Sequence, residues 1–270
     1  MQELWLLKLG GSIITHKEVA DFAPRTAHIA AIAHHIAGAA RDPRKDFIIV
    51  HGGGSAAHTI AAQHNLRAGT RGDAAKVATA HAITTNLHRL QDAVVHALQR
   101  AGAAAVGVRS EHIFTTHAGA LAHSDLPPLG ALLRNRRIVV LSGAVVPDMR
   151  WGHAILSGDT IVAHIARHFD THHIALASDT DGLFSADPHT TPDATHIDSI
   201  TLRDALDARI ATGAHTTDVT GGMAGKLQAF APLLDLPHTP TITLFNGTIS
   251  ANFSHLFHAP DTLTCTRIVV

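Results

Sequence analysis

The sequence predicts an α/β fold built around a mainly parallel sheet. Short, continuous apolar runs are typical of strands covered on both faces, and amphipathic segments with helical spacing lie between them. The order strand, glycine turn, helix occurs twice within the first 65 residues, which is the rhythm of βαβ units. With 270 residues, 46% of them hydrophobic, the chain can bury a large core in one or two closely joined lobes.

The first strand is expected at 4–9 and the second at 47–50, and each runs directly into glycines. Between them, residues 27–40 carry apolar side chains every three to four positions, which indicates an amphipathic helix. A second helical stretch is expected from about 55 to 64. The first two strands should therefore be parallel neighbours, with both glycine turns at their carboxyl ends.

A long helix is expected next, with Asp73 as its cap and Gly102 just beyond its end. The segment 104–130 is broken by glycine and proline and is interpreted as hairpins or loops over the first lobe. Strands are then expected at 137–141, 174–177, 241–245 and 264–270, and helices from Gly158 and over 202–212 and 223–234. A boundary near residue 165 divides one continuous fold into an acceptor-binding lobe, 1–165, and a nucleotide-binding lobe, 166–270.

Charge and cysteine content exclude several classes of protein. The 21 basic and 22 acidic residues leave a formal net charge of −1, and no run of like charge is long enough to follow a nucleic-acid backbone. One cysteine supports neither a disulfide framework nor a thiolate zinc site. The apolar amino-terminal run is too short for a signal sequence or a membrane span. We expect a cytoplasmic enzyme that binds neither nucleic acid nor membrane.

Histidine is unusually frequent, with 24 copies, while tyrosine is absent. The adjacent pairs His34-His35 and His172-His173 point in divergent directions on a helix or a strand, and no His-Glu-x-x-His sequence occurs. Most of these histidines are interpreted as helix-surface residues, so a metal-storage role is the weaker hypothesis.

The two glycine turns, Gly10-Gly11 and Gly52 to Gly54, carry the functional signal. Glycine lets the main chain approach a phosphate closely, and successive backbone amides at a helix start bind anions. A single such turn is weak support, because tight turns use the same residues; two in succession favour a phosphate site. The segment around Lys226 lacks Walker A spacing, and no Gly-x-Gly-x-x-Gly follows the first strand.

Three lysines stand beside glycine turns: Lys8, Lys17 and Lys226. Phosphoryl transfer needs cations around the migrating group, because negative charge spreads over its oxygens. Lys17 and Lys226 could equally be ordinary solvated side chains, whereas Lys8 interrupts an apolar strand. Asp179 lies in an acidic turn that could orient a lysine or approach Mg²⁺, or could be a plain turn former. His58, one helical turn past the triple glycine, could donate to a phosphate or cap a helix.

These motifs resemble those of the amino acid kinase superfamily and, within it, those of the isopentenyl phosphate kinases. The resemblance rests on 8–17, which opens Lys-Leu-Gly-Gly-Ser, on 51–58 with its Gly-Gly-Gly-Ser, on 155–159 and on 218–226. It implies a three-layer αβα sandwich, usually a homodimer, that uses ATP and Mg²⁺ to phosphorylate isopentenyl phosphate in isoprenoid biosynthesis. No protein ligand for the metal is assigned, since ATP would carry most of its coordination.

The resemblance also implies roles for individual residues. ATP would be bound by Lys8, Gly10, Gly11, Ser12, Gly54, Asp179, Gly222 and Lys226. The acceptor phosphate would be bound by Gly53, His58 and Gly158. Lys17 would stabilise the transition state, with Lys8 and His58 as the other catalytic side chains.

Two departures from the family pattern leave the identity of the acceptor open. Ala56-Ala57 stand where relatives commonly carry Phe-Gly, and Gly143-Ala144 where they carry Gly-Asp. A fosfomycin-type phosphonate kinase of the same superfamily is therefore the alternative, and a non-catalytic ligand sensor on the same fold is a more distant one. The organic tail of the acceptor is expected near Ala56-Ala57.

Overall fold

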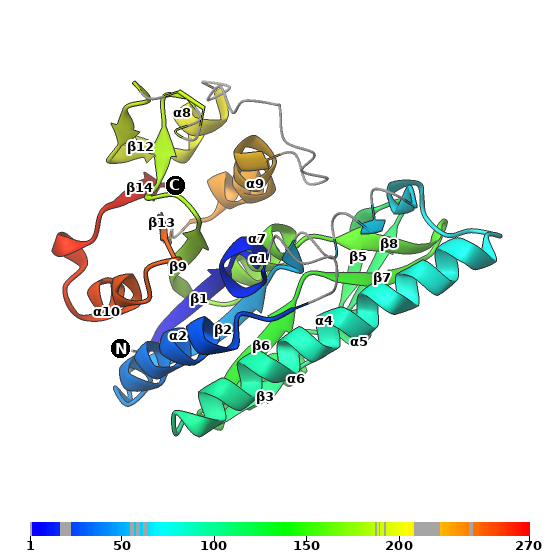
Figure 1. Cartoon of the computed structure of the whole chain (residues 1–270), viewed down its shortest axis with the longest axis horizontal. Helices are drawn as coiled ribbons and strands as arrows, with labels where there is room; N and C mark the ends of the chain where they lie inside the picture. The colour runs from blue at the N-terminus through cyan, green and yellow to red at the C-terminus, as the bar shows by residue number, and fades with distance from the viewer. Residues whose placement is uncertain are drawn as a thin grey trace.

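The computed structural model describes residues 2–16, 23–54, 57, 60–61, 64–186, 188, 190–191, 193–207, 222–237 and 240–270. Its centre is an eight-stranded sheet with the order β12-β14-β13-β9-β1-β2-β6-β3 (Figure 1). The strands are β1 (Glu3–Leu9), β2 (Lys45–His51), β3 (Ala105–Gly107), β6 (Ile138–Ser142), β9 (Thr171–Ser178), β12 (Ser199–Thr201), β13 (Thr241–Asn246) and β14 (Cys265–Val269). All neighbours are parallel except β13 and β14, so the predicted mainly parallel sheet is confirmed.

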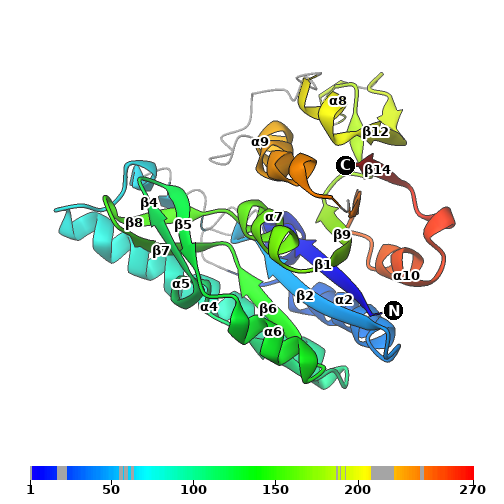
Figure 2. The same ribbon diagram turned by 180° about the vertical axis from the view of Figure 1, so that it is seen from behind.

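Helices cover both faces of this sheet, as the views from two sides show (Figures 1 and 2). One face is packed by α1 (Gly11–Ile14), α2 (Thr26–Ala39), α4 (Ala74–Arg100) and α10 (Ala251–His258). The other is packed by α6 (Pro127–Arg134), α7 (Gly158–His168), α8 (Leu202–Asp207) and α9 (Gly222–Phe230). Alternate residues of one strand serve the two cores: Leu7 lies in the first and Leu6 in the second, which confirms the three layers.

Most predicted elements are found within one or two residues of their predicted ends. Asp73 caps α4 as expected, because its carboxylate accepts a hydrogen bond from the Lys76 amide at 3.0 Å. The helix expected at 223–234 ends at Phe230 and continues as a 3-10 turn, Ala231–Asp235, because Pro232 has no amide hydrogen to donate. The helix expected at 202–212 is described only to Asp207. Helix α10 was not predicted from the sequence.

A smaller four-stranded sheet, with the order β5-β4-β7-β8, lies beside α4 at one end of the molecule (Figure 1). It consists of β4 (Phe114–His117), β5 (Ala120–Ser124), β7 (Ala144–Asp148) and β8 (Gly152–Leu156). The hairpin of β4 and β5 confirms the interpretation of 104–130 in part. The same segment also contains β3 of the large sheet and the start of α6, which were not predicted, and neither were β7 and β8. The remaining short elements are α5 (Ser110–Ile113), a hairpin of β10 (Leu183–Phe184) and β11 (His196–Ile197), and 3-10 turns at Leu66–Ala68 and Pro260–Thr262.

The buried carboxylate of Asp148 holds the two hairpins of this small sheet together. It accepts hydrogen bonds from the Thr116 hydroxyl at 2.7 Å, the Gly119 amide at 2.8 Å and the Trp151 amide at 2.7 Å. Burial alone would raise the pKa of Asp148, but these hydrogen bonds outweigh it and hold the pKa well below its usual range. Within the described residues, no helix combines the length and apolar character that crossing a bilayer requires.

Candidate active site

The two glycine turns predicted from the sequence touch each other. β1 and β2 are parallel neighbours with Leu9 beside His51, and the Gly52 amide donates to the Leu9 carbonyl at 2.9 Å. A Cβ atom on Gly11 would lie 2.0 Å from the Gly54 nitrogen and 2.2 Å from its Cα. Main chain therefore lies against main chain, and no side chain fits at Gly11.

Position 54 also requires glycine, because of its backbone conformation and the space around it. Its φ of +67° belongs to the left-handed region, and a Cβ there would lie 2.2 Å from the Thr15 hydroxyl oxygen. That hydroxyl donates to the Gly11 carbonyl at 2.7 Å. Thr15, which the sequence reasoning did not select, thus braces the first turn with its hydrogen bond and fills the space beside Gly54 in the second.

Lys8 forms a buried ion pair with Asp159, the second residue of α7. The Lys8 Nζ lies 2.7 Å from each carboxylate oxygen of Asp159. The pair explains why a lysine is tolerated in an apolar strand, since a buried charge needs a charged partner. The Ser157 hydroxyl caps α7 by accepting from the Thr160 amide at 3.1 Å, and Asp159 lies where the helix dipole favours a negative charge.

Gly158 places the start of α7 beside both turns. A Cβ on Gly158 would lie 3.7 Å from the Lys8 Cε and 3.7 Å from the His51 carbonyl oxygen. A Cβ on Gly143 would lie 2.9 Å from the Gly158 nitrogen. The carboxyl ends of β1, β2 and β6 and the amino end of α7 therefore meet at one edge of the sheet, where backbone amides can receive phosphate oxygens.

The residues predicted to bind the nucleotide lie after the next strand of the sheet, β9, and on α9. The Gly10 amide donates to the Ala177 carbonyl at 2.9 Å, which places Asp179, two residues further on, at the same edge. Asp181 accepts a hydrogen bond from the Asn246 side chain at 3.1 Å. Gly222 is the first residue of α9 and Lys226 lies one turn later, on a helix that packs against α7.

A third apolar cluster, separate from the two cores of the large sheet, lies next to Gly53. A Cβ on Gly53 would lie 2.5 Å from the Ala57 Cβ and 2.9 Å from the Leu87 Cδ2. The buried members of this cluster are Ala61, Leu66, Ala80, Ile83, Leu87 and Val145, with Ala57, Ile60 and Ile155 packed against them. We call this set the Gly53 cluster. It lies where the sequence predicted the organic tail of the acceptor.

A sequence model described as the amino acid kinase family matches residues 3–238. The chain belongs to the amino acid kinase family. It is 31% identical to the isopentenyl phosphate kinase of Methanothermobacter thermautotrophicus, over 83% of this chain and 84% of the relative. It is 33% identical to the isopentenyl phosphate kinase of Haloferax volcanii, over 85% and 88% of the two chains.

The fold agrees with solved members of the family. X-ray structures of isopentenyl phosphate kinase superpose with a TM-score of 0.82 at 23% sequence identity, covering 99% of this chain and 100% of the other. The structural likeness supports the predicted amino acid kinase fold, and the sequence likeness supports the resemblance that the motifs indicated.

In this member of the amino acid kinase family, eight of the predicted site residues lie at or near one edge of the sheet: Lys8, Gly10, Gly11, Ser12, Gly53, Gly54, Gly158 and Asp179. Lys17 and His58 lie outside the described residues, so their roles stay predictions. Asp159 was overlooked as a functional residue, although the motif 155–159 contained it. The sequence pattern that could have revealed Asp159 is an acidic residue directly after a glycine that starts a helix, in a chain that also has a lysine in an apolar strand.

A second overlooked residue is His51, which is fully buried at the end of β2. Burial lowers the pKa of His51 to about 4, and the nearby Arg109 guanidinium lowers it further, against a hydrogen bond with the Gly52 carbonyl that raises it. The imidazole is therefore neutral at pH 7.

Protonation of His51 is expected to weaken the fold in acid. In the unfolded chain its pKa is 6.5, so as the pH falls from 6.5 to about 4 the unfolded state gains a proton that the folded state excludes. The difference costs about 3 kcal/mol of stability by pH 4. We expect urea unfolding of the wild type to lose more free energy between pH 7.5 and 4.5 than that of His51→Asn. Equal losses would contradict this role.

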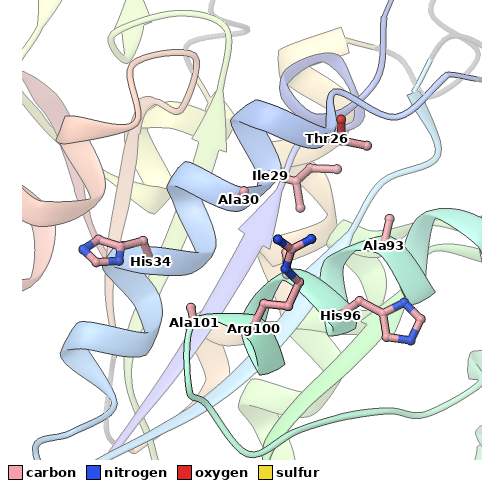
Figure 3. A pocket seen from close by; sticks show the side chains of 9 residues that line it. Thr26, Ile29, Ala30, His34, Ala93, His96, Arg100 and Ala101 are labelled. Carbon is pink, nitrogen blue, oxygen red and sulfur yellow. The ribbon is translucent and has the colours of Figure 1, made fainter.

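The kinase also has a groove of about 420 Å³ whose lining side chains come from α2, α4 and the residue after α4 (Figure 3). It is lined by Thr26, Ile29, Ala30, His34, Ala93, His96, Ala97, Arg100 and Ala101. Because neither turn and none of the predicted site residues contribute to it, the groove is not the place of phosphoryl transfer.

Proposed function

We propose that this chain is an ATP-dependent kinase that transfers the γ-phosphate of ATP to isopentenyl phosphate, forming isopentenyl diphosphate. The observation that carries the proposal is the backbone contact of Gly11 with Gly54, because it joins the donor turn to the acceptor turn. The names of the two relatives support the acceptor assignment.

The transfer is direct. An oxygen of the acceptor phosphate attacks the γ-phosphorus, the bond to the bridging oxygen breaks, and ADP leaves. The acceptor is already ionised at neutral pH, so positioning and charge neutralisation suffice without a strong base. Lys8, aligned by Asp159, lies where it can neutralise donor oxygens. Lys17 would stabilise the transition state and His58 would donate to the acceptor phosphate.

Mg²⁺ fits this site as a companion of ATP and not as an ion held by a protein cage. Among the described residues no group of three or more metal-binding side chains occurs, and the Asp159 carboxylate is occupied by Lys8. When bound with ATP, the ion would neutralise phosphate oxygens. Asp179 directly follows the last residue of β9, and its carboxylate would face the nucleotide.

The Gly53 cluster favours an acceptor with an apolar tail over fosfomycin. Its side chains are aliphatic, and two of them, from Ala57 and Leu87, lie directly against the acceptor turn. A branched hydrocarbon gains free energy on leaving water for such surroundings, whereas a compact polar phosphonate does not.

An ATP-consumption screen tests the proposal. The acceptors are isopentenyl phosphate, dimethylallyl phosphate, fosfomycin, carbamate, uridylate and N-acetylglutamate. We expect turnover with the two prenyl phosphates. Preference for fosfomycin would establish the alternative, and turnover with none would favour a ligand sensor.

The contribution of the tail is measurable without mutation. Ethyl phosphate has three carbons fewer than isopentenyl phosphate, and each buried methylene contributes about 0.8 kcal/mol. We therefore expect kcat/KM for ethyl phosphate to be about 50-fold lower, at an unchanged KM for ATP. Equal kcat/KM values would show that the tail does not contact the Gly53 cluster.

The finer points of the resemblance belong to the same proposal. The enzyme would be a cytoplasmic homodimer in isoprenoid biosynthesis, with an acceptor-binding lobe at 1–165 and a nucleotide-binding lobe at 166–270. Light scattering of the purified chain, which would give twice the 28.5 kDa of one copy for a dimer, tests the assembly.

A further inference from the structure

His51 carries a feature that the transfer chemistry does not use. Its side chain is fully buried, its Nδ1 lies 3.2 Å from the Gly52 carbonyl oxygen, and its Nε2 is buried without a hydrogen-bond partner among the described residues. A buried polar group of this kind needs an explanation. The carbonyl oxygen can only accept a hydrogen bond, so Nδ1 carries the proton. Nε2 then has only a lone pair, and leaving an acceptor unpaired costs less than leaving an N–H donor unpaired.

The direction of this hydrogen bond sets the orientation of the next peptide. His51 follows Phe47 and Ile49 in alternation along β2, and both lie in the core on the α2 and α4 face. The Gly52 carbonyl, held by the imidazole, therefore points toward that face. In a planar trans peptide the carbonyl and the following N–H point in opposite directions. No described peptide bond is cis, so the Gly53 N–H points toward the opposite face.

The opposite face is where the charged part of the site lies. Lys8 alternates with Leu4 and Leu6, which belong to the core on the α6 and α7 side, and Lys8 pairs there with Asp159. A Cβ on Gly158 would lie 3.7 Å from the His51 carbonyl oxygen, so the start of α7 adjoins this turn. The Gly53 N–H is thus directed to the side on which an acceptor phosphate would be received.

We propose that His51 is a positioning residue, whose Nδ1–H holds the Gly52 carbonyl inward and thereby presents the Gly53 N–H to the acceptor phosphate. The inference rests on the proposed function for the identity of that acceptor. The orientation of the Gly52–Gly53 peptide is independent of the proposed function. A neutral imidazole is required, and the low pKa of His51 keeps it neutral at pH 7.

Two amide substitutions separate this role from mere packing. In His51→Asn the side-chain amide nitrogen occupies the place of Nδ1, whereas in His51→Gln it moves to the place of Nε2. We expect His51→Gln to raise the acceptor KM about tenfold, as loss of one hydrogen bond implies, while the KM for ATP stays within twofold. His51→Asn should keep both constants near the wild-type values. Equal acceptor KM values in the two variants would overturn the proposal.

His173→Gln is the matched control. His173 lies on β9, where burial lowers its pKa, and it stacks on Trp5 with ring centroids 4.0 Å apart, away from the carboxyl end of the strand. Its replacement should lower the melting temperature and leave both KM values unchanged. If His51→Gln does not fold, His51→Ala takes its place with the same expected rise in acceptor KM.

A second readout separates failure of this inference from failure of the proposed function. In ¹⁵N-labelled protein, inorganic phosphate should shift the Gly53 amide resonance of the wild type and of His51→Asn, but not that of His51→Gln. A shift of equal size in all three, or in none, would overturn the role of His51. Such a shift in a wild type that does not turn over isopentenyl phosphate would contradict the acceptor assignment alone.

Discussion

Replacing Lys8 with methionine is expected to lower kcat about 1000-fold. The Lys8 ammonium is held by a buried carboxylate at the carboxyl edge of β1, with Nζ 2.7 Å from Asp159. Preorganised positive charge of this kind contributes most where charge develops in the transition state. Substitution also leaves the Asp159 carboxylate buried and unpaired, which destabilises a fold by about 3–5 kcal/mol. Steady-state kinetics and urea unfolding measure the two effects.

A double variant separates the loss of rate from the loss of stability. In Lys8→Met with Asp159→Asn neither position carries a buried charge, so stability should largely return while kcat stays low. The control is Lys76→Met on α4, whose side chain lies outside the site and whose kcat should match the wild type. Recovery of kcat in the double variant would show that Lys8 serves the fold and not the transfer.

Replacing Gly11 with alanine is expected to abolish measurable turnover and to lower stability strongly. The new Cβ would lie 2.0 Å from the Gly54 nitrogen and 3.1 Å from the Gly53 carbonyl carbon. The three nearest atoms all belong to the main chain, so no flexible group can yield and the two glycine turns must move apart. A displacement of about 1 Å at reacting groups costs on the order of 100-fold in rate even when the fold survives.

Gly38→Ala is the matched control for this change. Gly38 lies inside α2, and a Cβ there would meet nothing within 4 Å. Alanine favours a helix over glycine by about 1 kcal/mol, so this variant should unfold at higher urea and keep full kcat. If Gly11→Ala behaved like Gly38→Ala, the contact between the turns would not be part of the active site.

Local patterns in the sequence predicted the elements well where the pattern is strong. The apolar run of β1 and the capped start of α4 at Asp73 are examples, since both depend on residues within a few positions of each other. The hairpin of β7 and β8 and the helix α10 were missed. The end of β7 is held by Asp148, whose carboxylate accepts a hydrogen bond from the Gly119 amide, 29 residues away in sequence. No local sequence pattern reveals such a distant partner.

Sequence patterns alone indicate the parallel α/β class, the two glycine turns, and a lysine that needs a partner. The folded chain is needed to identify this partner as Asp159, 151 residues further along, and to bring Gly11 against Gly54. The folded chain also reveals that His51, directly before the second glycine turn, is fully buried. The physical reason is that strand order and helix placement result from packing of the whole chain, while a residue's own neighbours in sequence fix only its local conformation.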